Sequence, residues 1–262
     1  MPIAELVGVA LRLERAYEHI DALKHESRMF MMELPQPYAI TIDSELEGGE
    51  HIVRAKVFRR PPARLGILAI DAAHNLRAAL DMVAWELALK GDDPPPRDDS
   101  HTAFPICTKP EYWESNGTKR KIERIPSEAV EVIRSFQPYN RSHTEPPRLR
   151  VVQSLDNWGK HKAIPEITSF YIGRLTILSG YELISFNTRA FEDGDEVGRV
   201  RRIGPRNDTN ERFHAEALCH VGFSVDGPAY GWPIDFLENA YKTISDEIVP
   251  AFQRFFEIVP GN

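Results

Sequence analysis

The longest uninterrupted helical pattern in this 262-residue chain runs from Leu65 to Lys90, LGILAIDAAHNLRAALDMVAWELALK. At 100° per residue its large apolar side chains fall on one face of a helix. They are Leu68, Leu76, Leu80, Val83 and Leu87. Such a stripe is stable only when other elements cover it, so the stretch predicts a long central helix on which the rest of the fold is assembled.

Polar side chains occupy the opposite arc of this predicted helix, among small alanines. They are Asp71, His74, Asn75, Arg77 and Asp81. Because alanine lets a second helix approach closely, the polar arc is suited to face a neighbouring element rather than water. Several members are three or four residues apart, so side chains such as Arg77 and Asp81 can touch along the helix.

Other helices and one hairpin are predicted on both sides of the central helix. Residues 3–34 have a helical pattern that Pro35 and Pro37 end. Two alternating stretches near 38–60 flank a Gly-Gly pair, which is typical of a β-hairpin. Two further helices are predicted, at 127–136 and 148–162.

The pattern changes in the last third of the chain. Between about 172 and 226, alternating β-branched and aromatic residues predict a small antiparallel sheet. A helix from Ile234 to about Ile258 closes the chain, with a kink at Pro250. The sequence therefore predicts an α+β fold, mainly a helical bundle with the hairpin and the small sheet. We expect one compact unit over 1–262, with 1–165 and 230–258 as helical core and 172–226 as β-rich section.

The charge balance limits the partners that the chain as a whole can attract. Its 32 Lys and Arg against 39 Asp and Glu give a net charge of −7, so there is no global attraction to nucleic acid or to an anionic membrane. Contact with RNA therefore requires a local basic patch. Candidate patches are Lys119-Arg120-Lys121 with Arg124, and Arg199, Arg201, Arg202 and Arg206. The simpler interpretation of both is solvated surface charge.

Cysteine use and the lack of targeting patterns favour a cytoplasmic protein. Cys107 and Cys219 stand far apart, whereas secreted scaffolds carry more cysteines and metal sites carry closer pairs. The N-terminal stretch lacks the pattern of a signal peptide, and no apolar run approaches the ~20 residues that span a bilayer. No phosphate-binding glycine loop and no H-x-x-x-H pattern occur in the sequence. We therefore expect no cofactor, no metal and no membrane partner.

The polar arc of the central helix is the first candidate site. A carboxylate beside a histidine sets its tautomer and charge, and a nearby arginine can hold an oxyanion or phosphate through two hydrogen bonds. His74, Arg77 and Asp81 are therefore candidate catalytic residues for acid–base chemistry on a phosphodiester. Asn75 is a candidate substrate-binding residue. The alternative is a buried polar network, with Arg77 paired to Asp81 and His74 bonded to a backbone carbonyl.

A second cluster lies near the predicted end of helix 148–162. It comprises Asn157, Lys160 and His161. If this cluster converges on the polar arc of the central helix, it completes a pocket in which His161 is catalytic and Asn157 and Lys160 bind substrate. The alternative is helix capping and exposed charge, because the helix dipole favours cations at a C-terminus.

The string DAAHNLRAALDMVAWELA resembles a signature found in a large set of bacterial proteins of unassigned function, approximately GDAxHNLRSALDHLVWxL. Further matches follow in order: Phe104-Pro105-Ile106, Gln137-Pro138-Tyr139, and LDNWGKHK, which is similar to L-x-N-x-D-K-H-R in those proteins. The resemblance spans residues 60–165. It implies a family relationship and no particular activity.

The R-S-A-L-D-H part of that signature also resembles the R-x4-6-H spacing of HEPN ribonucleases. These are all-helical toxin and phage-defence enzymes that cut RNA without a metal, with the 2′-hydroxyl as nucleophile and usually with a site shared across a dimer. The resemblance implies RNA binding or processing, a homodimer, and a partner protein such as an antitoxin. Arg12 and His19 have the same spacing on the first predicted helix.

Carried onto this chain, the HEPN arginine is Arg77 and the histidine position is Met82. A thioether neither takes up nor releases a proton, so the standard catalytic pair is missing from the central helix. Three interpretations stay open: the chain is a non-catalytic relative, it uses another histidine such as His74 or His161, or the likeness is superficial. RNA binding is compatible with the loss of catalysis. The alternative function is a non-enzymatic interaction or structural module.

Overall fold

The computed structural model describes residues 3–43, 49–91, 101–140, 148–161, 168–177, 181–187, 189–203, 215–224 and 231–257. The chain divides into two compact units. The first contains Met1–Ala22, Leu68–Lys162 and Asp235–Asn262, and the second contains Leu23–Ile67 and Ala163–Ile234. The predicted α+β class is confirmed, with helices, antiparallel sheets and a C-terminal helix. The expectation that residues 1–262 form one compact unit stays a prediction.

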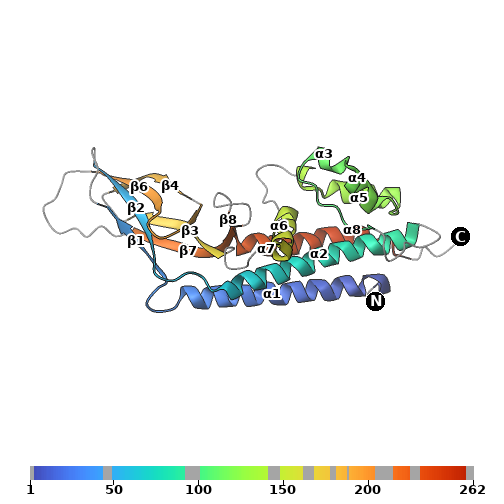
Figure 1. Ribbon diagram of the computed structural model, residues 1–262, viewed down its shortest axis with the longest axis horizontal. Coiled ribbons are helices and arrows are strands. Elements are labelled where there is room, and N and C mark those ends of the chain that lie inside the picture. The colour runs from blue at the N-terminus through green and yellow to red at the C-terminus, as the bar shows by residue number, and fades with distance from the viewer. Residues whose placement is uncertain are drawn as a thin grey trace. The chain divides into compact units, whose positions relative to one another are not determined.

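Two long helices, α1 (Val7–Met31) and α2 (Ala63–Gly91), supply residues to both units. Within the first unit they lie alongside each other (Figure 1). α2 confirms the predicted central helix and extends it by two residues at the start and one at the end. Its predicted apolar face is buried, and so are alanines around it such as Ala72 and Ala79. These small side chains let neighbouring helices approach α2 closely.

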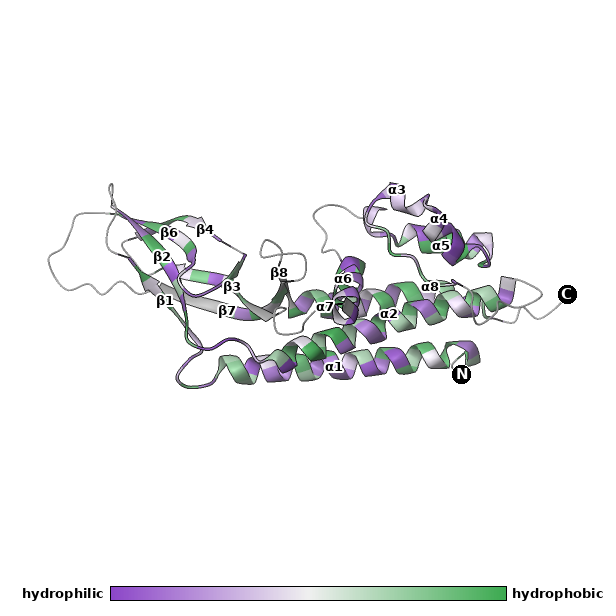
Figure 2. Ribbon diagram, viewed as in Figure 1, coloured by the Kyte–Doolittle hydropathy of each residue, from purple (hydrophilic) through white to green (hydrophobic). Residues whose placement is uncertain are grey.

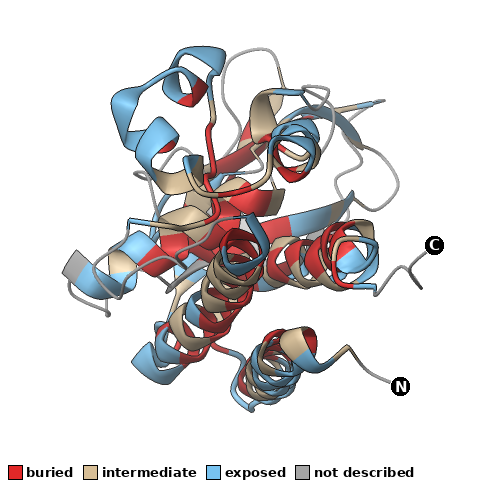
Figure 3. Cartoon of the chain, turned by 90° about the vertical axis from the view of Figure 1, so that its right-hand side faces the viewer, coloured by how far each residue is buried: buried red, intermediate tan, exposed pale blue. Residues whose placement is uncertain are grey.

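Shorter helices complete the first unit. They are η1 (Ala4–Leu6), α3 (Pro110–Trp113), α4 (Asn116–Ile122), α5 (Ser127–Ser135), η2 (Pro138–Asn140) and α6 (Arg148–His161). α5 and α6 match the helices predicted at 127–136 and 148–162. Figure 3 looks along the helices and shows buried residues on the faces that they turn toward one another. Phe104 and Phe252 are fully buried there, with ring centroids 6.5 Å apart.

The C-terminal helix is interrupted rather than simply kinked. α7 (Ile234–Lys242) passes into a π-helical turn, η4 (Thr243–Ile248), which is followed by α8 (Val249–Gln253). Pro250 has no backbone N–H to donate, so a regular helical ladder cannot continue through it. Arg148, the first residue of α6, donates from Nη1 to Thr243 Oγ1 at 2.7 Å and to Glu247 Oε1 at 2.9 Å. These bonds fix the start of α6 to the π-helical turn.

The described residues of the second unit form two four-stranded antiparallel sheets (Figure 1). The first has the order β1 (Tyr38–Ile42), β2 (Glu50–Val57), β6 (Glu196–Arg202) and β4 (Tyr181–Phe186). The second has the order β5 (Ala190–Phe191), β3 (Thr168–Ile177), β7 (Ala215–Ser224) and β8 (Gly231–Pro233). The predicted hairpin is thus β1–β2, with Tyr38 opposite Val57. It does not stand alone, because β2 also pairs with β6.

An aromatic cluster forms part of the core of the second unit. Phe170 lies 6.1 Å from Phe30, 5.8 Å from Tyr38 and 5.7 Å from Phe191 between ring centroids. Hydrophobic residues are spread along α2, and the strands carry both hydrophobic and polar residues (Figure 2). Among the helices in the described ranges, none is both long enough and apolar enough to cross a membrane.

Candidate functional site

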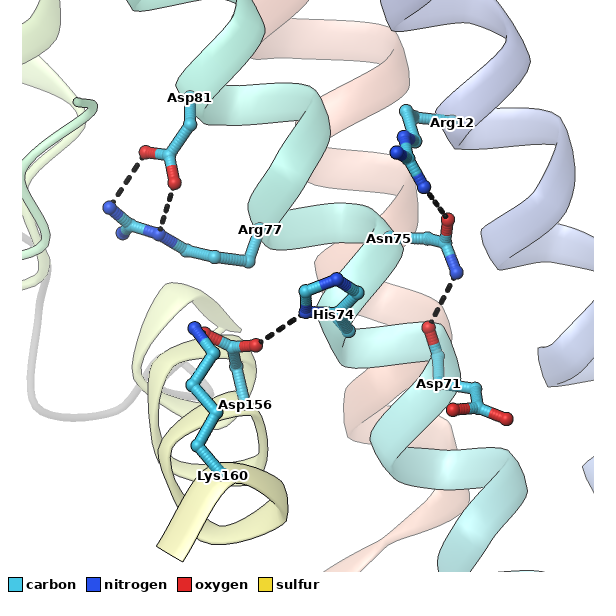
Figure 4. Close-up of polar contacts among 8 residues, drawn as sticks. All are labelled: Arg12, Asp71, His74, Asn75, Arg77, Asp81, Asp156 and Lys160. Atoms are coloured by element: carbon cyan, nitrogen blue, oxygen red, sulfur yellow. Dashed lines mark hydrogen bonds and ion pairs between the residues drawn. The ribbon is translucent and has the colours of Figure 1, made fainter. Parts of the chain in front are cut away.

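The polar arc of α2 divides into two groups in the first unit (Figure 4). Asn75 faces α1, where its Oδ1 accepts a hydrogen bond from Arg12 Nη1 at 3.1 Å. Its Nδ2 donates to the backbone oxygen of Asp71 at 2.8 Å. Asn75 is 7% exposed, so it positions the exposed Arg12 side chain and has little surface of its own for a substrate.

The second group faces α6 and is centred on His74 (Figure 4). His74 Nδ1 lies 2.9 Å from Oδ1 of Asp156, whose other oxygen accepts a bond from Lys160 Nζ at 2.6 Å. The Asp156 side chain is 5% exposed and the His74 side chain is 55% exposed. An ionised carboxylate only accepts, so Nδ1 carries the hydrogen, and Nε2 of the neutral ring is the basic nitrogen. A buried acid thus orients an exposed base.

Asp156 is the member of this site that the sequence analysis missed. Asn157, Lys160 and His161 were selected instead, although Asp156 and Lys160 are four residues apart and can pair along a helix. Lys160 does converge on the polar arc through Asp156. Asn157 is exposed on α6. His161 ends α6, and the prediction that its side chain completes the pocket falls outside the described residues.

Arg77 and Asp81 form a doubly hydrogen-bonded pair, as the alternative interpretation predicts. Arg77 Nε and Nη2 donate to the two Asp81 oxygens at 3.0 and 2.7 Å, and the Phe104 backbone N–H donates to the same carboxylate at 2.9 Å. Burial raises the pKa of Asp81, although Arg77 and the Phe104 N–H favour its ionised form. Burial, with the nearby charge of Arg77, lowers the pKa of Lys121.

A cleft of about 360 Å³ joins these groups. Its lining includes Arg12, His74, Arg77, Met82, Trp85 and Lys160. Met82, the position of the histidine in the HEPN pattern, is partly buried, and the methyl end of its side chain lies against Gly8 of α1. The cleft therefore contains three cationic side chains, the Asp81 carboxylate and one histidine. The histidine comes from a different turn of α2 than the HEPN pattern uses.

The approach of α6 to α2 depends on a glycine. A Cβ atom at Gly159 would overlap the Cγ2 methyl of Ile70 on α2 and lie 3.4 Å from its Cβ. Without a side chain at this position, α6 can lie close enough for Asp156 to reach His74. Gly159 is therefore a structural requirement of the site, although it has no chemistry of its own.

This arrangement is suited to anion binding and proton transfer. Arg12, Arg77 and Lys160 supply positive charge, and Nε2 of His74 can accept a proton. In the part of the chain that the structure describes, no three His, Cys, Asp or Glu side chains gather as a metal-binding group. A phosphate group or a phosphodiester fits the charges and the hydrogen-bond donors of the cleft.

Comparison of the chain with protein-family models, with curated proteins and with solved structures finds no match. The resemblance to the bacterial signature and to HEPN ribonucleases therefore stays a prediction.

Proposed function

We propose that this cleft binds the phosphate backbone of RNA and that His74 transfers a proton in a metal-independent cleavage of the chain. One observation carries the proposal: an exposed histidine is held by a buried carboxylate in a cleft lined by three cations. The HEPN resemblance agrees with an RNA substrate, and His74 takes the role that Met82 cannot perform. The proposed site lies within the first unit.

The chemistry follows from the positions of the hydrogen atoms. Nε2 of His74 takes the proton of a ribose 2′-hydroxyl, and that oxygen attacks the adjacent phosphorus. The bond from phosphorus to the 5′-oxygen breaks, and the leaving oxygen takes a proton from water. The protonated His74 then returns its proton to the hydroxide left behind, which restores the neutral ring. The products are a 2′,3′-cyclic phosphate and a free 5′-hydroxyl. Nη1 of Arg77, which is not used in the pair with Asp81, and Lys160 Nζ stabilise the charge on the phosphate.

A cleavage assay tests this proposal. Labelled single-stranded RNA is incubated with the protein in excess EDTA, and the product ends are identified. Loss of general-base catalysis predicts that His74→Ala cuts about 100-fold or more slowly than wild type. Asp156→Asn retains the shape of the acid but removes its charge, so it also slows cleavage. The matched control is His25→Ala, because His25 is an exposed histidine of α1. An uncut RNA, or equal rates for His74→Ala and wild type, would overturn the proposal.

A second candidate function is a non-enzymatic interaction module. It is supported by the saturation of the Arg77–Asp81 pair, in which the carboxylate accepts three hydrogen bonds and the Arg77 side chain is 13% exposed. In this function the same residues hold α2 to the segment before α3. An RNA-cleavage assay distinguishes the two candidates. An interaction module cuts no RNA, so His74→Ala changes nothing in that assay, whereas Asp81→Ala lowers its folding stability.

A further inference from the structure

The cleft has a charged end and an apolar end along one face of α2. His74, Arg77, Met82 and Trp85 follow each other at intervals of three to five residues and all line it. A helix rises 1.5 Å per residue, so Trp85 lies about 12 Å from Arg77 along the axis. A ligand that fills this face needs an anion at one end and an apolar group at the other.

Trp85 is placed to supply the apolar surface. It is only partly buried, so part of the side chain stays accessible to a ligand. Side chains of an α-helix lean toward its N-terminus, so Trp85 leans over the turn that carries Asp81 and Met82 and toward Arg77. The indole therefore extends the charged part of the cleft with a flat aromatic surface.

We propose that Trp85 stacks on an unpaired base of the RNA whose phosphates contact Arg12, Arg77 and Lys160, so that the cleft selects single-stranded RNA. This inference rests on the proposed function. Any nucleobase can stack on an aromatic ring, whatever its sequence. The faces of bases inside a duplex are already stacked on their neighbours, so a paired strand offers phosphates but no free base.

Abasic oligonucleotides test the stacking contact directly. Fluorescence anisotropy compares the binding of two labelled RNA strands of equal length. Both carry 2′-O-methyl groups and cannot be cut, and one of them lacks its central bases. Wild type should bind the intact strand about fivefold to 100-fold more tightly than the abasic strand. Trp85→Ala should bind both strands equally, and Trp85→Phe should retain most of the preference. Tyr112→Ala, which removes a 51% exposed aromatic ring on α3, should behave as wild type.

The outcomes separate the two proposals. If Trp85→Ala keeps the wild-type preference while Lys160→Glu weakens both strands equally, RNA binding stands and stacking is wrong. If wild type binds neither strand, both proposals are wrong. Trp85→Leu retains more apolar volume than Trp85→Ala and replaces it if the smaller side chain prevents folding. A wild-type protein that binds duplex RNA as tightly as the single strand also contradicts the inference.

Discussion

Asp81 shows how burial and pairing compete at a single residue. Burial raises the pKa of this carboxyl above its ordinary value of 3.8, and this effect outweighs the opposing effects of Arg77 and the Phe104 N–H. Between 3.8 and the raised pKa, the folded protein holds a proton that the unfolded chain has lost. The free energy of unfolding therefore falls as pH rises through this interval.

The Asp81→Asn variant tests this linkage, because asparagine keeps the shape and does not titrate. The unfolding free energy of wild type minus that of Asp81→Asn should decrease as pH rises above 3.8. Urea unfolding of both proteins at each pH measures the difference. Asp193 gives a control of opposite sign, because bonds from the Val57 N–H and Lys56 lower the pKa of its carboxyl. The corresponding difference for Asp193→Asn should increase with pH up to 3.8. A difference that increases with pH for Asp81 contradicts the argument.

Spacing along one helix predicts some of these contacts and not others. Arg77 and Asp81 are four residues apart, and their pairing was predictable from helical geometry alone. The interpretation as a buried polar network gave His74 a backbone carbonyl as its partner, whereas the candidate-site interpretation gave it a carboxylate. The structure places Asp156 there. These two residues are 82 positions apart, and helical spacing contains no information about which helices meet.

At the scale of secondary-structure elements, the site depends most on the position of α6. Gly159→Ala adds a methyl group that overlaps Ile70. Ile70 is β-branched, so its methyl group cannot easily rotate away. Overpacking costs about 1–3 kcal/mol, against a gain of about 1 kcal/mol from alanine's helix propensity. We expect Gly159→Ala to lose about 1 kcal/mol of unfolding free energy and to bind RNA more weakly, as measured by urea unfolding and anisotropy.

Gly117 on α4 provides the matched control for this change. A Cβ there meets only Ser115 Oγ, at 3.9 Å, so Gly117→Ala should stabilise the protein by up to about 1 kcal/mol. Gly159→Ala should cost less in an Ile70→Ala background than in wild type, because that background lacks the overlapping methyl group. Equal stabilisation by the two glycine substitutions would show that α6 does not need the close approach.

Elements were more predictable than their partners. Apolar periodicity and prolines located α2, α5 and α6 to within about two residues, because these signals are local. Alternation of apolar and polar residues located the strands between 172 and 226, but it showed only which side chains share a face of the sheet. It gave no means of pairing β2 with β6, in which Ile52 lies opposite Arg199. The π-helical turn before Pro250 was also missed, since a proline predicts an interruption and not its form.

Because the whole chain is acidic, RNA can bind only where the surface is locally basic. A net charge of −7 repels RNA overall. The basic patches that the sequence suggested are largely neutralised: Lys119 lies 3.6 Å from Glu114, Arg199 lies 2.7 Å from Glu196 and Arg201 lies 2.7 Å from Glu50. Arg206 falls outside the described residues. The cleft also pairs Arg77 with Asp81 and Lys160 with Asp156, but it adds Arg12 and a space for a ligand.

Salt dependence can identify which of these surfaces RNA uses. Each phosphate contact on a single strand contributes about −0.7 to the slope of log K against log salt concentration. Contacts from Arg12, Arg77 and Lys160 predict a slope of about −2, because each cation releases the counterions of one phosphate. Lys160→Ala should make the slope shallower by about 0.7, whereas Lys119→Ala should leave it unchanged, since Lys119 is not among the residues that line the cleft. Titrations of a non-cleavable strand at several salt concentrations measure both slopes. Equal changes for Lys160→Ala and Lys119→Ala would mean that RNA binds to diffuse surface charge rather than to the cleft.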